Sequence, residues 1–446
     1  MKNYPFIATL VFCILSGCNK HDEIEIDVQK LSYPDKIVMG KPVVRGDSIE
    51  LTWSKLDNAQ FSRYLIIRKE SKDLSYNPEG ESKAGIWVIS SISNKNTTRY
   101  IDKNIPACPY LEYQIIGRTS NNDYSYDYIF SNSAIYERPN IKLFDIDPLD
   151  VIPDFSRKWL YLIESKNGRI QIINYETLTE VKTLTSNATI GYCSIGKYNG
   201  NNELYVPRND GWIFIYNPET LALIDKIDIS VPSSCIVNNE GKLFISTSPE
   251  WNYPLRVYDR ATKQMITKTG WYENTRLRLV PGTKTDIFEV TINIWPVDQC
   301  YYRFNATGGL IYSNTDQYHG DYPLDHEAFQ FFPDGKKYIT GSVGAIYNID
   351  MTYIRRLQSG NYYFSSFEFN QDGSVVYCGC SKSIMSFSTS DCSIIKTYST
   401  LGYPYKLFRD GNTLICISLI YSSITTDDGY FFDGQPPKVL IEKIML

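Results

Sequence analysis

The chain has 446 residues, several times the length of an ordinary domain, and this length excludes a single small domain. Hydrophobic residues make up 43% and charged residues 21%, so the chain holds enough apolar material for packed cores and is not disordered as a whole. The 45 Lys and Arg are balanced by 50 Asp and Glu, with a net charge of -5 and no basic block, so we expect no nucleic-acid partner. The 36 Tyr, 20 Phe and 7 Trp favour β-rich structure, whereas 3 His leave little for histidine-based metal chemistry, and we expect no cofactor and no metal.

The N-terminus has the pattern of an export signal. Lys2 precedes an apolar run from Tyr4 to Leu15, which is too short to span a bilayer but suits a signal peptide. The run ends in Leu15-Ser16-Gly17-Cys18, which resembles the bacterial lipobox. The resemblance implies that residues 1–17 are a lipoprotein signal peptide, that Cys18 carries a diacylglycerol, and that residues 18–32 form a linker. An ordinary signal peptide that contains a cysteine by chance is the alternative.

The residues after Cys18 give an indication of the protein's location in the cell. The stretch from Asn19 to Glu25 is acidic and resembles the signal that exports Bacteroidetes lipoproteins to the cell surface. This resemblance implies a lipid-anchored protein of the cell outer membrane, exposed outside the cell. Disulfides could form there. However, Cys378 and Cys380 are two residues apart on one strand face and no CxxC pair exists, so we expect buried free thiols.

Residues 33–138 alternate between apolar and polar positions in short segments separated by polar turns, which is typical of a β-sandwich. Ile49, Leu51 and Trp53 fall on one face of one such segment. The stretch resembles a fibronectin type III domain, with Trp53 as its core tryptophan and Tyr113 at its tyrosine corner. Nothing in it points to catalysis, so we interpret it as a spacer; a binding role is the alternative.

Residues 139–446 contain a repeat of about 40 residues. Asp-Gly turns at residues 334, 372 and 410 are each 38 residues apart, and Asp-Gly provides the positive φ angles of a tight hairpin. Strands that follow such turns are predicted to begin near Lys158, Asn202, Lys242, Asp286, Lys337, Val375 and Thr413. The spacing predicts seven units of four antiparallel strands, which is the composition of a propeller blade.

Several third strands of the repeat end in a Tyr-Asn/Asp-x-x-Thr turn, as at Tyr216 and Tyr258. This signature resembles YVTN and WD-repeat-like β-propellers. The last unit contains only three strands, so we expect a strand over residues 141–147 to complete it and close the ring. The predicted fold class is all-β, a fibronectin type III-like sandwich followed by a seven-bladed propeller.

Aromatic residues are concentrated in the loops expected on one face of the propeller. Exposed aromatic rings stack on the apolar faces of sugars and are enriched at protein interfaces. The candidate binding residues are Trp212, Trp251, Tyr253, Trp271, Tyr272, Trp295, Tyr322 and Tyr363. The alternative is that these rings pack between blades.

The longest loop of this face, residues 314–326, contains two of the three histidines. If the protein is an enzyme, the candidate catalytic residues are His319, His326, Asp321 and Asp325, which would act as acid and base in a lyase or glycosidase. A solvated loop without catalytic function is the alternative, which we favour.

We therefore predict an outer-surface lipoprotein whose propeller face binds an extracellular ligand. A glycan is the first choice and an envelope protein is the alternative, with membrane attachment through the lipid anchor.

Overall fold

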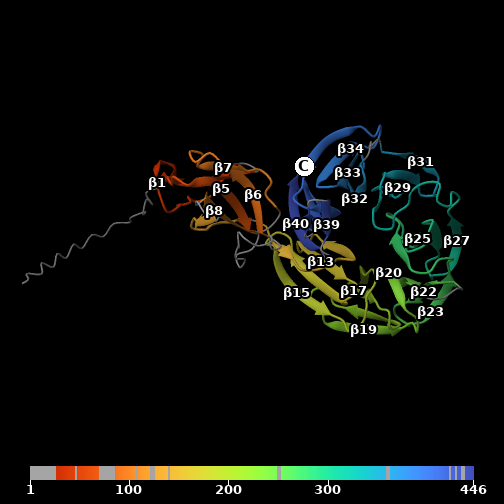
Figure 1. Ribbon diagram of the computed structural model, residues 1–446. Coiled ribbons are helices and arrows are strands. Elements are labelled where there is room, and N and C mark those ends of the chain that lie inside the picture. Colours follow the sequence, from red (N-terminus) through yellow and green to blue (C-terminus); the bar gives the residue numbers. More distant parts are fainter. Residues whose placement is uncertain are drawn as a thin grey trace, which may run out of the picture. The chain divides into compact units, whose positions relative to one another are not determined.

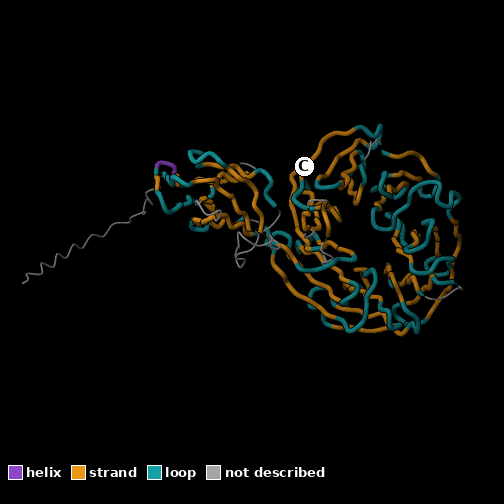
Figure 2. Tube along the Cα trace, viewed as in Figure 1, coloured by secondary structure: helices purple, strands orange, loops and turns teal. Residues whose placement is uncertain are grey.

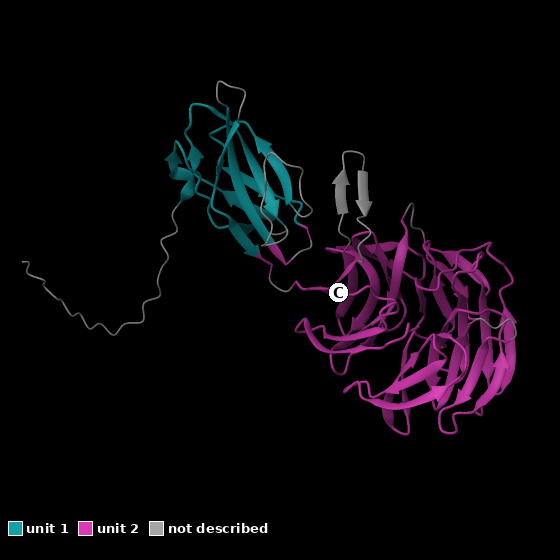
Figure 3. Ribbon diagram, turned by 60° about the horizontal axis from the view of Figure 1, so that its bottom comes forward, with its two compact units in different colours: residues 1–105, 111–136 teal, residues 106–110, 137–446 magenta. Residues whose placement is uncertain are grey.

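The computed structural model describes most of the chain and divides into two compact units. The described residues are 27–45, 48–69, 86–106, 109–120, 126–138, 141–248, 253–357, 362–420, 423–426, 429–432 and 437–446. Unit 1 is Met1–Ile105 with Leu111–Tyr136, and unit 2 is Pro106–Tyr110 with Glu137–Leu446 (Figure 3). The predicted signal peptide and Cys18 lie outside the described residues.

Strands make up nearly all of the described regular structure, apart from a 3-10 turn at Val28–Lys30 (Figure 2), and this confirms the all-β prediction. Among the residues with described structure, none forms a helix with the length and apolarity that a bilayer crossing needs.

Unit 1 consists of two β-sheets and a short parallel pair. Its strands are β1 (Ser32–Tyr33), β2 (Val43–Arg45), β3 (Ser48–Thr52), β4 (Lys55–Leu56), β5 (Phe61–Lys69), β6 (Ile86–Ile92), β7 (Arg99–Asp102), β8 (Tyr110–Ser120), β9 (Tyr126–Phe130) and β10 (Ala134–Glu137). The larger sheet has the order β10-β8-β5-β6, with β9 also paired to β8, and the smaller has the order β2-β3-β7. Strands β1 and β4 form the parallel pair.

Side chains from both sheets of unit 1 meet in its core. Trp53, just after β3, packs edge-on against Tyr64 of β5, with ring centroids 5.5 Å apart, and both side chains are fully buried. Tyr113 of β8 donates a 2.8 Å hydrogen bond to Asp102 of β7, which also pairs with Arg68 at 3.0 Å. An aromatic contact and a buried polar cluster therefore join the two sheets.

Within the described residues, unit 2 contains seven four-stranded antiparallel sheets, here numbered as blades 1 to 7. Blades 1 to 3 are β12 (Asp150–Asp154), β13 (Trp159–Glu164), β14 (Arg169–Asn174), β15 (Thr179–Thr185); β16 (Ser194–Tyr198), β17 (Asn201–Pro207), β18 (Trp212–Tyr216), β19 (Leu223–Asp228); and β20 (Ser233–Asn239), β21 (Lys242–Thr247), β22 (Leu255–Asp259), β23 (Met265–Thr269). Blades 4 to 6 are β24 (Thr275–Leu279), β25 (Asp286–Thr291), β26 (Gln299–Phe304), β27 (Leu310–Thr315); β28 (Phe329–Phe331), β29 (Lys337–Thr340), β30 (Ala345–Asn348), β31 (Tyr353–Arg356); and β32 (Phe364–Phe369), β33 (Val375–Cys380), β34 (Ser383–Ser388), β35 (Ile394–Ser399). Blade 7 joins β36 (Tyr403–Asp410), β37 (Thr413–Ile420), β40 (Lys438–Met445) and β11 (Leu143–Phe144), and a β38 (Ser423–Thr426) and β39 (Gly429–Phe432) hairpin lies between β37 and β40 in the chain.

The seven sheets form a closed β-propeller. Figure 1 shows them as radial blades around a common centre, with β15, β19, β23, β27 and β31 at the outer edge. The first strands of neighbouring blades contact one another, as β16 contacts β20 and β32 contacts β36. The burial pattern agrees with this arrangement, because β13 is almost entirely buried whereas β15 is almost entirely exposed.

The predicted repeat matches the observed strands closely because its signals are local. The second strands of the blades begin at Trp159, Asn201, Lys242, Asp286, Lys337, Val375 and Thr413, each within one residue of the predicted start. The three Asp-Gly turns have glycine φ angles of +67°, +73° and +61° at Gly335, Gly373 and Gly411. Glycine adopts positive φ angles at the lowest cost of any residue, which favours glycine at these turns.

Blade 7 is assembled from both ends of unit 2. Strand β11 pairs antiparallel with β40, with Leu143 opposite Leu440 and Phe144 opposite Val439. It is shorter than the strand predicted over 141–147, because the Ile146 N–H turns back to donate to the Phe144 carbonyl. Side chains reinforce the closure: Tyr175 of blade 1 donates to Asp410 of blade 7 at 2.7 Å.

Apolar side chains fill the spaces between neighbouring blades. Leu160 and Leu162 of blade 1 pack with Ile415 and Ile417 of blade 7. The described cysteines also lie in these layers and are buried free thiols, as expected: Cys193, Cys235, Cys300, Cys378, Cys380, Cys392 and Cys416.

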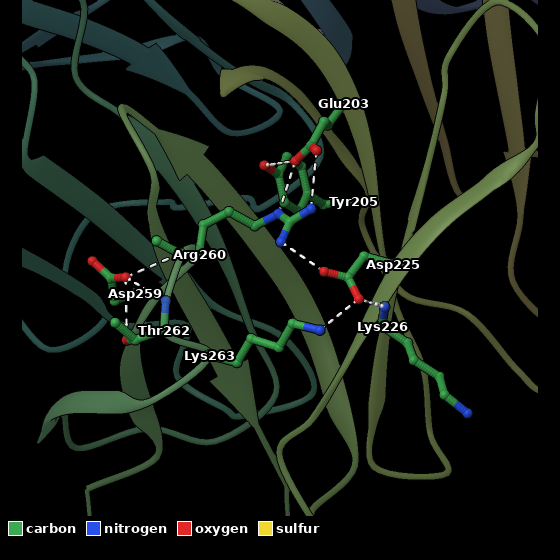
Figure 4. A network of polar contacts seen from close by, with 9 residues as sticks. Glu203, Tyr205, Asp225, Lys226, Asp259, Arg260, Thr262 and Lys263 are labelled. Atoms are coloured by element: carbon green, nitrogen blue, oxygen red, sulfur yellow. Dashed lines mark hydrogen bonds and ion pairs between the residues drawn. The ribbon is translucent and has the colours of Figure 1, made fainter. Parts of the chain in front are cut away.

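A buried charged network joins blades 2 and 3 (Figure 4). Arg260, which follows β22, binds both carboxylate oxygens of Glu203 at 2.9 and 3.0 Å, and it contacts Asp225 at 2.9 Å. Tyr205 donates to the same Glu203 carboxylate, and Lys263 pairs with Asp225 at 2.6 Å. Arg260 and Glu203 are about 95% buried, so each charge depends on its partner for stabilisation.

We predict that Arg260→Ala destabilises the propeller by about 3–5 kcal/mol, because it leaves the Glu203 carboxylate buried without its cation. The free energy of unfolding, measured by chemical denaturation followed by circular dichroism, tests this. The matched control is Lys284→Ala, which removes a well-exposed ion pair with Glu240 of similar length, 2.8 Å, and is expected to cost much less. Equal losses in the two variants would contradict the prediction.

Candidate functional site

Three loops around blade 4 bring together several of the predicted binding residues. They are residues 270–274 before β24, residues 292–298 between β25 and β26, and residues 316–328 between β27 and β28. The second and third loops are in close contact, because a Cβ atom at Gly320 would lie 2.5 Å from Pro296. Gly320 also has a φ of +98°, so the approach of these two loops requires glycine there. We name this surface the blade-4 rim.

Asp298 organises the blade-4 rim. One of its carboxylate oxygens accepts a 2.9 Å hydrogen bond from the Tyr272 hydroxyl, and the other lies 3.0 Å from Nδ1 of His319. Its side chain is only 2% exposed, whereas that of His319 is largely exposed. Burial and the neighbouring carboxylate raise the pKa of Tyr272, so its hydroxyl stays protonated and donates. One buried carboxylate therefore connects residues from all three loops.

Two tryptophans close to this cluster in the chain face solvent. Trp271 precedes Tyr272 in the chain and is 71% exposed, and Trp295 precedes Pro296 and is 92% exposed. Exposed aromatic rings on loops that are joined through Asp298 provide the kind of apolar surface that marks a ligand or partner site. Their exposure excludes the alternative that these two rings pack between blades.

The other predicted aromatic residues do not all belong to the rim. Tyr253 and Tyr363 are exposed on separate loops, before β22 and before β32. Trp212 is half-buried on β18, with the Lys226 ammonium 4.6 Å from its ring centroid. Tyr322 is half-buried and stacks on Tyr353 with centroids 3.9 Å apart, so it has a packing role. Trp251 lies outside the described residues.

The candidate catalytic residues do not converge on one point. His319 contacts Asp298 on the rim, whereas His326 packs edge-on against Tyr192 of a distant segment. Asp325 accepts the backbone N–H groups of Glu327 and Ala328, at 2.7 and 3.1 Å, and so stabilises a turn. Asp321 is exposed.

The two histidines and two aspartates of this loop therefore have different partners and do not form one acid–base site. Burial lowers the pKa of His326 to about 4, so this imidazole is neutral at pH 7. Within the described ranges, no three His, Cys, Asp or Glu side chains lie together as metal ligands would.

Asp298 was not predicted from the sequence. The sequence gives little indication of its role, because most aspartates in loops are exposed to solvent. Its importance comes from Tyr272 and His319, which lie 26 residues before it and 21 residues after it.

A buried polar network supports the rim from below. Thr275, the first residue after the 270–274 loop, donates to Glu289 at 2.7 Å, and Tyr302 donates to the other oxygen of Glu289 at 2.7 Å. The Thr275 N–H also donates to the Ser246 hydroxyl at 2.9 Å. Burial raises the pKa of Glu289 to about 7, even though both hydrogen bonds favour its charged form.

We predict that Glu289 makes the propeller less stable as pH rises from about 4.5 to 7. In this window the unfolded chain has released the proton that the folded protein still holds, so the free energy of unfolding falls with pH, by up to about 3 kcal/mol for this group. Glu289→Gln should remove this part of the slope, as measured by chemical denaturation across pH 4–8. A variant with the same pH dependence as the wild type would contradict the assignment.

Comparisons with known proteins do not identify a family for this chain. No family model matches the chain, and no curated protein matches it. Among solved structures, the chain is similar to the WD40 repeats of RRP9, with a TM-score of 0.48 and 10% identity, over 68% of this chain and 97% of that one. A structure of U3-55K gives the same TM-score and identity, over 68% of this chain and 98% of that one. These similarities do not identify a function.

Proposed function

We propose that the blade-4 rim binds an extracellular glycan. The observation that carries the proposal is the exposure of Trp271 and Trp295, which lie close in the chain to residues of the Tyr272–Asp298–His319 hydrogen-bond cluster. Aromatic faces stack on the apolar faces of sugar rings, and convergent polar groups orient a ligand through its hydroxyls.

The rim residues have different roles in the proposed binding of a sugar. The two indoles offer apolar platforms, and the exposed His319 ring keeps Nε2 available for a sugar hydroxyl. Asp298 holds both His319 and Tyr272 in place, so the polar groups are oriented before a ligand arrives. The loops extend from paired strands of blades 3, 4 and 5, which gives the surface a rigid base.

We predict that the Trp271→Ala/Trp295→Ala double variant loses at least about tenfold in glycan affinity, which corresponds to about 1.4 kcal/mol. Both side chains are exposed, so the fold should survive, and circular dichroism checks this. The measurement is binding of the full chain to a polysaccharide array, with release of reducing ends read from the same wells. Tyr363→Ala, an exposed aromatic on another loop, is the control and should bind as the wild type does.

Each outcome of the array selects between hypotheses. Retention that is lost in the double variant supports the proposal, and retention that survives it removes the rim assignment. Release of reducing ends would favour the lyase or glycosidase alternative, in which a His319→Ala or His326→Ala variant should lose turnover.

An envelope-protein scaffold is the second candidate, and exposed apolar pairs on the outer strands favour it. They are Leu223 and Ile224 on β19, Met265 and Ile266 on β23, and Ile394 and Ile395 on β35. Exposed apolar rows of this kind are typical of surfaces that partners cover. No signal on the array together with a stoichiometric protein partner in a pull-down would move this candidate ahead of the glycan.

We further propose that the protein is a lipoprotein of the cell outer membrane in which unit 1 is a fibronectin type III-like spacer. The lipobox resemblance at Cys18 and the acidic residues after it support the location. The two packed sheets of unit 1, with Trp53 in the core, support the domain type.

We predict that Cys18→Ser moves the protein from the membrane fraction to the soluble fraction and abolishes incorporation of a labelled fatty acid, because acyl chains are its proposed attachment. Cell fractionation and fatty-acid labelling measure the two effects. A Cys13→Ser variant, which changes a cysteine inside the predicted signal peptide, should remain acylated. Acylation of the Cys18 variant would contradict the anchor.

A further inference from the structure

Charged side chains from different blades meet at the centre of the propeller. They line a cavity of about 140 Å³ together with apolar residues; its lining includes Asp150, Arg276, Arg278, Glu327, Phe329 and Lys406. These residues come from β12, β24, β36 and the start of blade 5. The cavity is separate from the tryptophans of the blade-4 rim, none of which lines it.

Two of the charged side chains in this cavity form an ion pair. Arg276 of blade 4 donates to Asp150 of blade 1 at 2.7 Å, so the pair joins two blades that are not neighbours. The Arg276 guanidinium also stacks over Tyr192, 4.3 Å from its ring centroid. Burial opposes ionisation of Asp150, but Arg276, Lys406 and Arg278 together lower its pKa. Asp150 and Arg276 therefore neutralise each other.

The other two cations have no carboxylate partner. Arg278 donates to the backbone carbonyl of His326 and stacks over Phe329 at 4.4 Å, and its Nη1 atom is buried without a hydrogen-bond partner. Lys406 donates only to the backbone carbonyl of Glu327, at 3.2 Å, and is 9% exposed. Within the described part of the chain, neither side chain forms an ion pair.

Lys406 and the Nη1 atom of Arg278 are buried, and holding both cations there without an ion-pair partner is costly. Burial, followed by repulsion from Arg276, lowers the pKa of Arg278 to about 9 and that of Lys406 to about 8. The carboxylates of Asp150 and Glu327 offset this charge only in part, because neither forms an ion pair with Arg278 or Lys406 and the Glu327 side chain is 42% exposed. The centre of the ring thus has an excess of positive charge and an unused guanidinium N–H.

We propose that this cavity binds a single oxyanion group, a carboxylate, sulfate or phosphate, through Arg278 and Lys406. The planar guanidinium presents a free edge to the oxygens, and the ammonium adds a second charge-assisted hydrogen bond. The volume is well below the about 300 Å³ of sites for larger ligands. The cavity therefore suits one charged group with few waters and not a whole oligosaccharide.

The anion has two sources that an experiment can separate. It is either a free inorganic ion or the acidic group of a sugar whose remaining part lies on the rim. Isothermal titration calorimetry of the full chain with sodium phosphate, sodium sulfate and sodium glucuronate, in chloride of constant ionic strength, tests both, with glucose as the neutral control. General stabilisation by sulfate or phosphate through surface exclusion does not saturate, so a saturable isotherm with one anion per chain is the required result.

We predict that Arg278→Met and Lys406→Met each weaken anion binding at least tenfold. In anion-free buffer both variants should melt at the same or a higher temperature than the wild type, because each removes an uncompensated buried charge. Arg303→Met is the matched control: this arginine is in the same blade but pairs with Asp286, and the variant should bind as the wild type does. Having two variants keeps the test valid if one of them does not fold.

The outcomes separate this proposal from that of the rim. Saturable binding of phosphate or sulfate without binding of glucuronate or acidic oligosaccharides identifies a free inorganic ion. Binding of acidic oligosaccharides that requires both Arg278 and Trp295 identifies a group carried by the glycan. Absence of saturable binding with all three anions, or binding unchanged in both charge variants, overturns the anion site and leaves the glycan proposal standing.

Discussion

The propeller depends on one constraint, that the blade at which the ring closes is completed by strands from both ends of unit 2. Three C-terminal strands cannot complete a four-stranded sheet, and β11 provides the missing backbone hydrogen bonds along β40. An open edge at this point would template pairing with another chain. Closure also brings blade 1 against blade 7, where Leu160 and Leu162 pack with Ile415 and Ile417, so backbone pairing and apolar burial act at the same seam.

Buried charges in this protein are of two kinds. Arg260 is fully matched by Glu203 and Asp225, and Arg276 is matched by Asp150, so these residues hold blades together. Among the described residues, Arg278 and Lys406 hydrogen-bond to backbone carbonyls and lie against aromatic rings, and neither forms an ion pair. A fold that only needed stability would fill their places with apolar side chains, because an unmatched buried cation costs free energy that packing would not. This contrast is the reason to assign the ring centre to a ligand.

The blade-4 rim combines a rigid base with an exposed apolar surface. Glu289, Thr275 and Tyr302 are buried beneath it in a hydrogen-bonded network, and Asp298 fixes the polar side chains above. Loops held on paired strands can present Trp271 and Trp295 without a large entropic cost on binding. The rim and the cavity at the ring centre have different chemistry, one aromatic and the other cationic, which is why their ligands can be tested independently.

Local patterns of residues predict the strands, the repeat and the closing segment. Apolar alternation and Asp-Gly turns are signals within a few residues, so the starts of the second strands were predicted to within one residue, and Trp271 and Trp295 could be named as loop residues. Only the tertiary structure decided which side chains meet. Asp150 and Arg276 are 126 residues apart, and His319 lies beside Asp298 while His326 of the same loop faces Tyr192. Such encounters follow from the radial placement of whole blades, which no local pattern of residues encodes.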